Sequence, residues 1–174
     1  MSKLISLAAV LALYAGAASA QTADSASGGP AQLNAMDRQF VTKATIGGMT
    51  EVQESQLAQG QAQSDDVKSF GQHMVTDHVA AGEKLKSIVA AEGIQAPADL
   101  DKKHQQELSS LEKLKGGAFD KRYVKAQLAA HKQTVALFEK EASSGQDPQL
   151  KQFASATLPT LKEHLSDVEG LAKQ

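Results

Sequence analysis

Three of the five histidines interrupt apolar patterns typical of helix packing. His78, His131 and His164 each lie in a segment whose apolar residues recur three and four positions apart. Glu51 projects to the apolar side of a fourth segment, at about 100° per residue. A buried polar group without a partner costs about 1–3 kcal/mol, so four such residues at core positions need an explanation.

Three interpretations explain why these residues occupy core positions. Neutral imidazoles and a carboxylate can bind a divalent first-row metal such as Zn, Fe or Cu, with Asp77, Glu54 and Gln127 as further ligands or as partners of the ligands. Alternatively, the four residues form a hydrogen-bonded polar layer that only fixes the register of the helices. A pocket for another ligand is a third interpretation. The spacing lacks the specificity of a paired Cys motif, so all three stay open.

The elements that must position these residues are four helices. Segments with helical periodicity run over Met36–Gln63, Asp65–Glu92, Phe119–Ala142 and Pro148–Lys173. Ser64 and Asp147 are suitable N-caps, and Gly93 is suited to ending the second segment. The short loops after the first and third segments predict two antiparallel hairpins, and therefore an all-α four-helix bundle. In the longer connection between the hairpins, residues 98–115 favour a short extra helix, which we expect to lie across the top end of the bundle.

The height of each residue decides which of them can meet. Glu51 and His78 are about equally far from the loop that joins their helices, which predicts a difference of ~2 Å along the axes. His131 can share this layer, whereas His164 is offset from it by ~6 Å. Pro159 should kink the last helix and thereby bring His164 into the layer or take it out.

The first twenty residues are typical of a signal peptide. Lys3 is followed by an apolar run at 4–14 and by the small-residue cleavage pattern Ala18-Ser19-Ala20. We therefore expect residues 1–20 to be removed and the protein to be periplasmic or secreted. Residues 21–35 are rich in Ser, Gly and Ala, which predicts a disordered leader before a bundle domain at 36–174.

Composition excludes several other functions. The chain has 174 residues, of which 41% are apolar and 22% charged, with a formal charge of −2. This balance provides no strong field for nucleic acid or an anionic membrane, and no later segment has the ~20 apolar residues of a membrane span. The absence of Cys excludes disulfides, thiolate metal sites and acylated cysteines. Gly47-Gly48 is interpreted as a place of close packing or a bend.

The sequence also resembles a known family. The distinctive parts are the Met-Val-x-Asp-His stretch at 74–78, the Phe-Asp-x-x-Tyr stretch at 119–123 and the Leu-Pro-x-Leu-x-x-His stretch at 158–164. They are similar to an exported bacterial family of unknown function, often labelled as outer membrane proteins and placed in the ferritin-like superfamily. The resemblance implies a ferritin-like bundle. Ferritin-like diiron proteins use Glu-x-x-His on two helices, and this motif is absent here.

These observations lead to one functional hypothesis and its alternatives. We expect an exported ferritin-like bundle that binds a divalent metal (Fe, Zn or Cu) through Glu51, His78, His131 and His164, with an envelope or stress-related role. A protein partner in the envelope and peripheral contact with the outer membrane fit this hypothesis. The first alternative is a structural or interaction protein in which the layer only specifies packing. The second is an enzyme of oxygen or peroxide chemistry that uses a bound metal.

Overall fold

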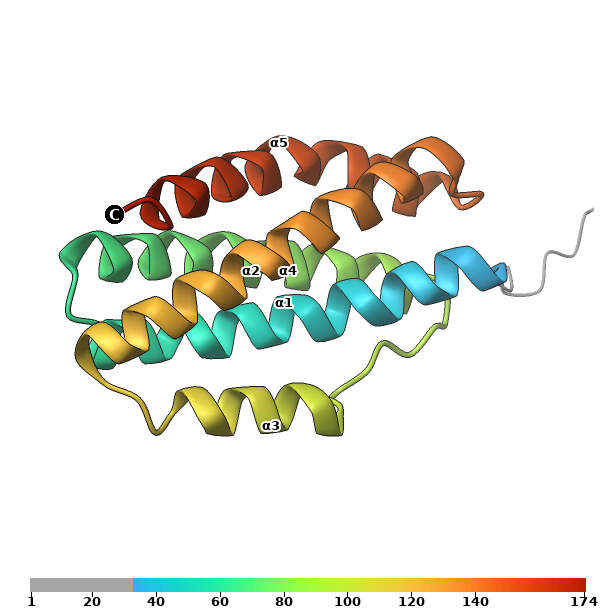
Figure 1. Ribbon diagram of the computed structural model, residues 1–174. Helices are drawn as coiled ribbons and strands as arrows, with labels where there is room; N and C mark the ends of the chain where they lie inside the picture. The colour runs from blue at the N-terminus through green and yellow to red at the C-terminus, as the bar shows by residue number, and fades with distance from the viewer. Residues whose placement is uncertain (1–32) are drawn as a thin grey trace, which may run out of the picture.

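A computed structural model of the chain describes residues 33–174, which form five helices and no strand (Figure 1). The helices are α1 (Ala35–Gln61), α2 (Asp65–Ala91), α3 (Lys102–Leu111), α4 (Gly116–Ser144) and α5 (Pro148–Leu171). The predicted all-α bundle with an extra short helix is confirmed. The predicted signal peptide and the leader up to residue 32 lie outside the described residues. None of the helices in this described part is long and apolar enough to cross a membrane.

The four long helices form two antiparallel hairpins. α1 packs mainly against α2, and α4 against α5; the hairpins meet through α1 with α4 and through α2 with α5. Asp120, in the first turns of α4, accepts hydrogen bonds from the backbone N–H groups of Gln63 and Ser64, so α4 begins beside the α1–α2 loop. The connection from α2 must therefore return along the whole bundle. Ferritin-like bundles also have one long crossover connection between their two hairpins. Membership of this chain in that superfamily stays a prediction.

The crossover explains why the prediction for the extra helix was too long and misplaced. α3 spans only Lys102–Leu111 and packs along α1 and α4 instead of lying across an end of the bundle (Figure 1). A chain that must cover the length of the bundle in the roughly 24 residues between Ala91 and Gly116 needs extended stretches on both sides of a short helix. Leu100 and Leu111, both buried, attach the two ends of this helix to the bundle.

The helix starts confirm one predicted cap and correct another. The Asp147 carboxylate accepts from the N–H of Leu150, as expected of an N-cap. Ser64 occupies the N-cap position of α2, but its side chain makes no capping hydrogen bond. At the end of the predicted leader, Leu33 is buried and Asn34 caps α1, which begins at Ala35.

Both hairpin loops are held by the same kind of contact, in which an aspartate carboxylate accepts hydrogen bonds from two backbone N–H groups. Asp37, near the start of α1, accepts from the N–H groups of Gln146 and Asp147, just as Asp120 accepts from those of the opposite loop. An Asp-x-x-aromatic pattern at 37–40 recurs at 120–123. Each hairpin thus begins with a carboxylate that holds the loop of the other hairpin, and this fixes how the two pack.

We expect Asp120→Ala to lower the free energy of unfolding by about 1–3 kcal/mol, because two loop N–H donors lose their acceptor. Lys121→Ala, at an exposed position on the same helix, is the control and should change stability by less than about 0.5 kcal/mol. Urea denaturation followed by circular dichroism measures both. Equal stability of the two variants would contradict the proposed role of Asp120.

The apolar core is divided into two clusters by a polar layer in the middle of the bundle. One cluster surrounds the rings of Phe40, Phe138 and Phe153, whose centroids lie 4.9–6.3 Å apart. The other contains Phe70 and Phe119. The layer between them contains the residues on which the functional hypothesis rests.

Candidate metal centre

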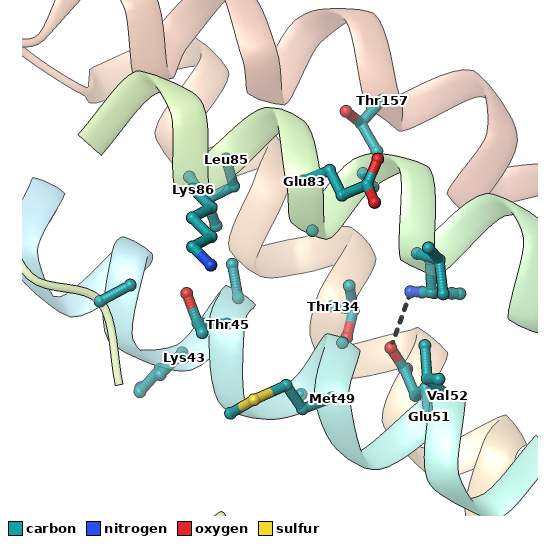
Figure 2. A pocket seen from close by; sticks show the side chains of 18 of the residues that line it. Lys43, Thr45, Met49, Glu51, Val52, Glu83, Leu85, Lys86, Thr134 and Thr157 are labelled. Carbon is teal, nitrogen blue, oxygen red and sulfur yellow. Dashed lines mark ion pairs between the residues drawn. The ribbon is translucent and has the colours of Figure 1, made fainter. Parts of the chain in front are cut away.

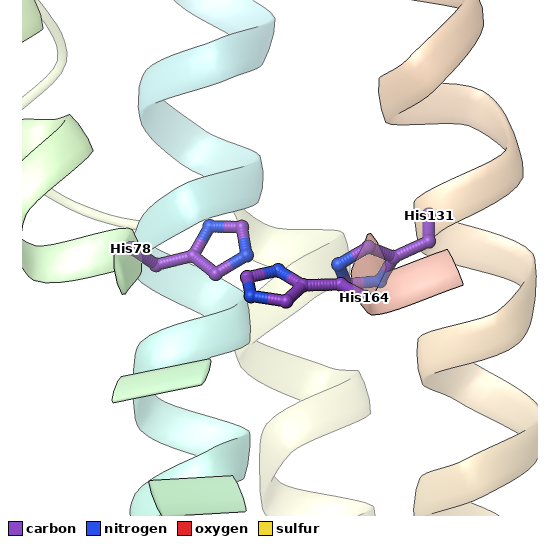
Figure 3. Close-up of side chains that lie close together, drawn as sticks. All are labelled: His78, His131 and His164. Carbon is purple, nitrogen blue, oxygen red and sulfur yellow. The ribbon is translucent and has the colours of Figure 1, made fainter. Parts of the chain in front are cut away.

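The three core histidines meet in one triangle. His78 projects from α2, His131 from α4 and His164 from α5 (Figure 3). Their ring centroids are 5.7 Å apart for His78 and His131, 5.3 Å for His78 and His164, and 5.5 Å for His131 and His164. The side chains are at most 7% exposed. His164, which the sequence left in doubt, therefore belongs to the layer.

One ring nitrogen of His131 and one of His164 are fixed by hydrogen bonds. His131 Nδ1 lies 3.0 Å from the carbonyl oxygen of Gln127, and His164 Nε2 lies 2.9 Å from a carboxylate oxygen of Asp77. A carbonyl oxygen only accepts, so Nδ1 of His131 carries the proton and its Nε2 has a free lone pair. Histidine ligands of metals are oriented in this way by a second hydrogen bond on the opposite nitrogen.

The other nitrogens are buried without a partner. His78 Nε2, His131 Nε2 and His164 Nδ1 make no hydrogen bond. One donor atom from each of the three histidines can be chosen so that all lie within 4.8 Å of one another. Two nitrogens bound to one metal at ~2.0–2.1 Å lie at most ~4.2 Å apart, so small rotations of the rings would suffice for ligation. The donors present thus fit a transition metal.

Burial keeps the imidazoles of His78 and His131 neutral. Desolvation and the neighbouring histidines lower the pKa of His78 to about 3, and desolvation lowers that of His131 to about 4. At pH 7 neither ring has to lose a proton before its lone pair can bind a metal ion.

Glu51 lies against the histidines rather than between their free nitrogens. Its Oε2 is 3.2 Å from His78 Nδ1 (the dashed line in Figure 2), and its Oε1 is 3.7 Å from His131 Nδ1. Burial, and then Glu54, raise the pKa of Glu51 to about 8. Since His78 is neutral at pH 7 as well, this close contact joins two neutral groups and is not an ion pair. The role of Glu51 as a direct ligand stays a prediction.

The remaining sequence candidates surround this centre. Gln127 Nε2 donates to Glu54 Oε2 at 2.8 Å, one helical turn from the triangle, and burial raises the pKa of Glu54 to about 7. A turn further along, the Tyr123 hydroxyl is 2.7 Å from that of Ser55. Tyr123 is fully buried, and desolvation raises its pKa, so it is a core residue with a satisfied hydroxyl.

The comparisons with known proteins give a family and a fold. The profile of a family described as "Domain of unknown function (DUF4142)" matches residues 22–171. The chain belongs to the DUF4142 family. No curated protein matches it. The labels "ferritin-like" and "outer membrane", which the resemblance carried, stay predictions for this DUF4142 chain.

Solved structures with the same fold are only distantly similar in sequence. A DUF305 fragment from Deinococcus radiodurans is 13% identical, with a TM-score of 0.70 over 82% of this chain and 99% of that one. CopM in its Cu(I)-bound form is 11% identical, with a TM-score of 0.66, and in its Ag-bound form 13% identical, with a TM-score of 0.65. Both CopM structures cover 79% of this chain and 95% of their own. These structural similarities establish that the fold is a helical bundle.

The other two histidines of this DUF4142 chain lie away from the centre. His73 is exposed on α2, and His104 bonds to Asp101 at the start of α3 with Nδ1 to Oδ1 at 2.8 Å. The helical periodicity of the sequence places His73 off the buried face of its helix by angle, and His104 lies in the connection between the two hairpins.

The metal-free DUF4142 chain should lose stability between pH 7 and 8. Folded Glu51 keeps its proton up to about pH 8, whereas in the unfolded chain it loses it above about 4.5. Within this window the folded state binds more protons, so a rise in pH favours unfolding, by about 1 kcal/mol between pH 7 and 8. Glu54 and Glu141, whose pKa burial raises to about 7, have the same sign and act mostly below pH 7.

His78 and His131 act at the acidic end instead. Their lowered pKa means that the unfolded chain binds more protons below about pH 6.5, so stability falls as the pH falls through that range.

Urea denaturation of wild type and Glu51→Gln at pH 7 and 8 isolates the contribution of the Glu51 carboxyl group to the alkaline loss of stability. The variant should lose most of the alkaline decrease; an unchanged decrease would contradict the neutral state of Glu51.

Proposed function

We propose that this DUF4142 protein binds a transition metal, and specifically copper, through His78, His131 and His164. The observation that carries the proposal is that each of the three histidines has a buried ring nitrogen without a hydrogen bond, and that one ring nitrogen from each lies within 4.8 Å of those of the other two. Leaving such atoms without a hydrogen bond costs about 1–3 kcal/mol each, and a bound metal ion removes this cost. Glu51, Asp77 and the Gln127 carbonyl then orient the three ligands.

Copper is favoured over zinc and iron by two arguments. For nitrogen ligands, divalent copper binds more tightly than divalent zinc or iron. CopM, which has the same fold, is described in copper- and silver-bound forms. Imidazole ligands in a buried site bring no negative charge to balance that of the metal ion. Loss of the Glu51 proton beside His78 would supply one when the ion binds, so binding should release a proton.

The proposed compartment follows from the sequence alone. The signal-peptide pattern of residues 1–20 supports export to the periplasm, and peripheral association with the outer membrane is part of this proposal. A copper-binding bundle in the envelope fits the stress-related role expected from the sequence.

Elemental analysis tests the metal proposal. The chain from Gln21, without a His tag, is loaded anaerobically with copper, desalted and analysed together with the triple variant His78→Ala, His131→Ala, His164→Ala. We expect about one copper per wild-type chain and none in the variant. The double variant His73→Ala, His104→Ala is the control and should bind like wild type. Absence of copper from folded wild-type protein would favour the alternative, a polar layer that only specifies packing.

A further inference from the structure

A cavity of about 920 Å³ opens between α1 and α2 and extends inward to α4 and α5 (Figure 2). Its inner end reaches Glu51, His78 and His164, and its outer end lies under residues 94–98 of the crossover connection. This volume is near the upper end of the range of ligand pockets, ~300–1,000 Å³, and far exceeds that of a metal ion. The space therefore fits an organic molecule.

Glycines keep the cavity open. Gly48 and Gly82 line it one helical turn from Glu51 and His78, respectively. A Cβ atom at Gly48, Gly82 or the neighbouring Gly47 would have no atom within 4 Å. The sequence-based interpretation of Gly47-Gly48 as a place of close packing is therefore wrong.

Close packing of α1 and α2 occurs elsewhere. At Gly71 a Cβ would lie 3.0 Å from Ala58 Cβ, so this glycine has a packing role. A glycine inside a helix costs about 1 kcal/mol relative to alanine. At Gly48 and Gly82, which line the cavity, no packing contact explains this cost.

The two ends of the cavity differ in charge. Lys43 and Lys86 line the outer end and form no ion pair with any residue in the described part of the chain. The Lys86 side chain extends toward Thr45, whose buried Oγ1 has no hydrogen-bond partner (Figure 2). Of the acidic residues that line the cavity, Asp77 lies beside His164 at the inner end and Glu83 lies on the side that faces Thr157 (Figure 2), whereas Glu51 is neutral at pH 7. An anionic group is therefore attracted to Lys43 and Lys86 at the outer end and repelled by Asp77 at the inner one.

Between the two ends the walls are mainly apolar. The residues that form them are Ala44, Ala81, Leu85, Val89, Phe138, Phe153 and Leu161. They come from all four long helices, so the cavity lies inside the bundle and not on one exposed face. Such walls favour a hydrocarbon or aromatic body over a polar one.

We propose that this cavity binds a free apolar molecule that carries one anionic group, such as a medium-chain carboxylate. Its anionic group lies beside Lys43 and Lys86, and its apolar body extends toward the histidines. The proposal goes beyond the metal site and does not depend on it, because the cavity is formed by the metal-free chain.

Calorimetric titration of the metal-free chain with decanoate tests the size of the cavity. Wild type should bind one decanoate, and Gly48→Leu, which fills the space, should weaken binding about tenfold or more. Gly60→Leu is the matched control: it lies on the same helix, also has open space around it and does not line the cavity, so it should bind like wild type. Both variants gain a better helix former, so loss of the fold is not expected.

A second titration tests the charge. The double variant Lys43→Gln, Lys86→Gln should bind decanoate about fivefold more weakly but the neutral analogue decanol unchanged, while Lys84→Gln, outside this cavity, should resemble wild type. Wild type that does not bind decanoate, or equal binding by Gly48→Leu and Gly60→Leu, would overturn the proposal. Copper content measured on the same variants is a separate readout, so failure of the metal proposal is recognised independently.

Discussion

Replacing His131 by leucine should weaken copper binding by on the order of a thousandfold. Structural metal sites contribute about 10–16 kcal/mol in total, so each ligand accounts for several kcal/mol, or two to three powers of ten in affinity. His131 is fully buried, and its Nε2 has no other partner. In the metal-free chain, leucine replaces a buried polar ring, whose Nε2 has no partner, by an apolar side chain of similar volume. The free energy of unfolding should therefore stay the same or rise.

Competition titrations with a copper chelator measure this affinity. Asp77→Ala should lose only about 10–100-fold, because Asp77 orients His164 without binding the metal itself. His73→Leu, at an exposed position of α2, should bind like wild type. Equal affinities of His131→Leu and wild type would contradict the three-histidine site, whereas the graded losses support ligand and partner roles.

Copper should stabilise the folded chain by about 4 kcal/mol when its free concentration is a thousand times the dissociation constant. For a chain of this length such a gain raises the melting temperature by roughly 10 °C. His164→Leu should lose this shift, since only two of the three nitrogens remain, while its metal-free melting temperature stays close to that of wild type.

Thermal melts by circular dichroism, with copper and with an excess of chelator, measure both effects. Zinc and iron at the same concentrations show whether the stabilisation is specific for copper. A shift of equal size in wild type and in His164→Leu would place the metal elsewhere on the chain. No shift in wild type would favour the packing-layer alternative.

Much of the architecture could be predicted from local patterns. Apolar residues at helical spacing mark the faces that become buried, and Asp147-Pro148 and Gly93 mark two helix ends, because caps act on neighbouring backbone groups. The same periodicity identified His78 as a core residue and His73 as a surface residue. Both are consequences of the angle between residues on one helix.

The features that could not be predicted depend on contacts between distant residues. The height of His164 was misjudged because counting residues from a loop treats the helices as parallel rods and ignores the direction of the side chains. Asp37 and Asp120 each hold a hairpin loop that lies more than fifty positions away in the sequence. The Asp-x-x-aromatic repeat was the one sequence signal that could have indicated it.

The cavity had a visible but misinterpreted signal. Gly47-Gly48 and Gly82 stand inside helices, where glycine is unfavourable, and close packing is the common explanation. Only the three-dimensional arrangement shows that α1 and α2 touch at Gly71 and leave space at Gly48. Sequence alone cannot distinguish a glycine that permits contact from one that preserves a space.

X-ray absorption spectroscopy of the copper-loaded chain tests the three-histidine site most directly. We expect about three nitrogen ligands at ~2.0 Å, with the outer-shell scattering typical of imidazole rings. The His78→Ala, His131→Ala, His164→Ala variant should show no such signal. A spectrum with only oxygen ligands, or one that the triple substitution leaves unchanged, would contradict metal binding by His78, His131 and His164.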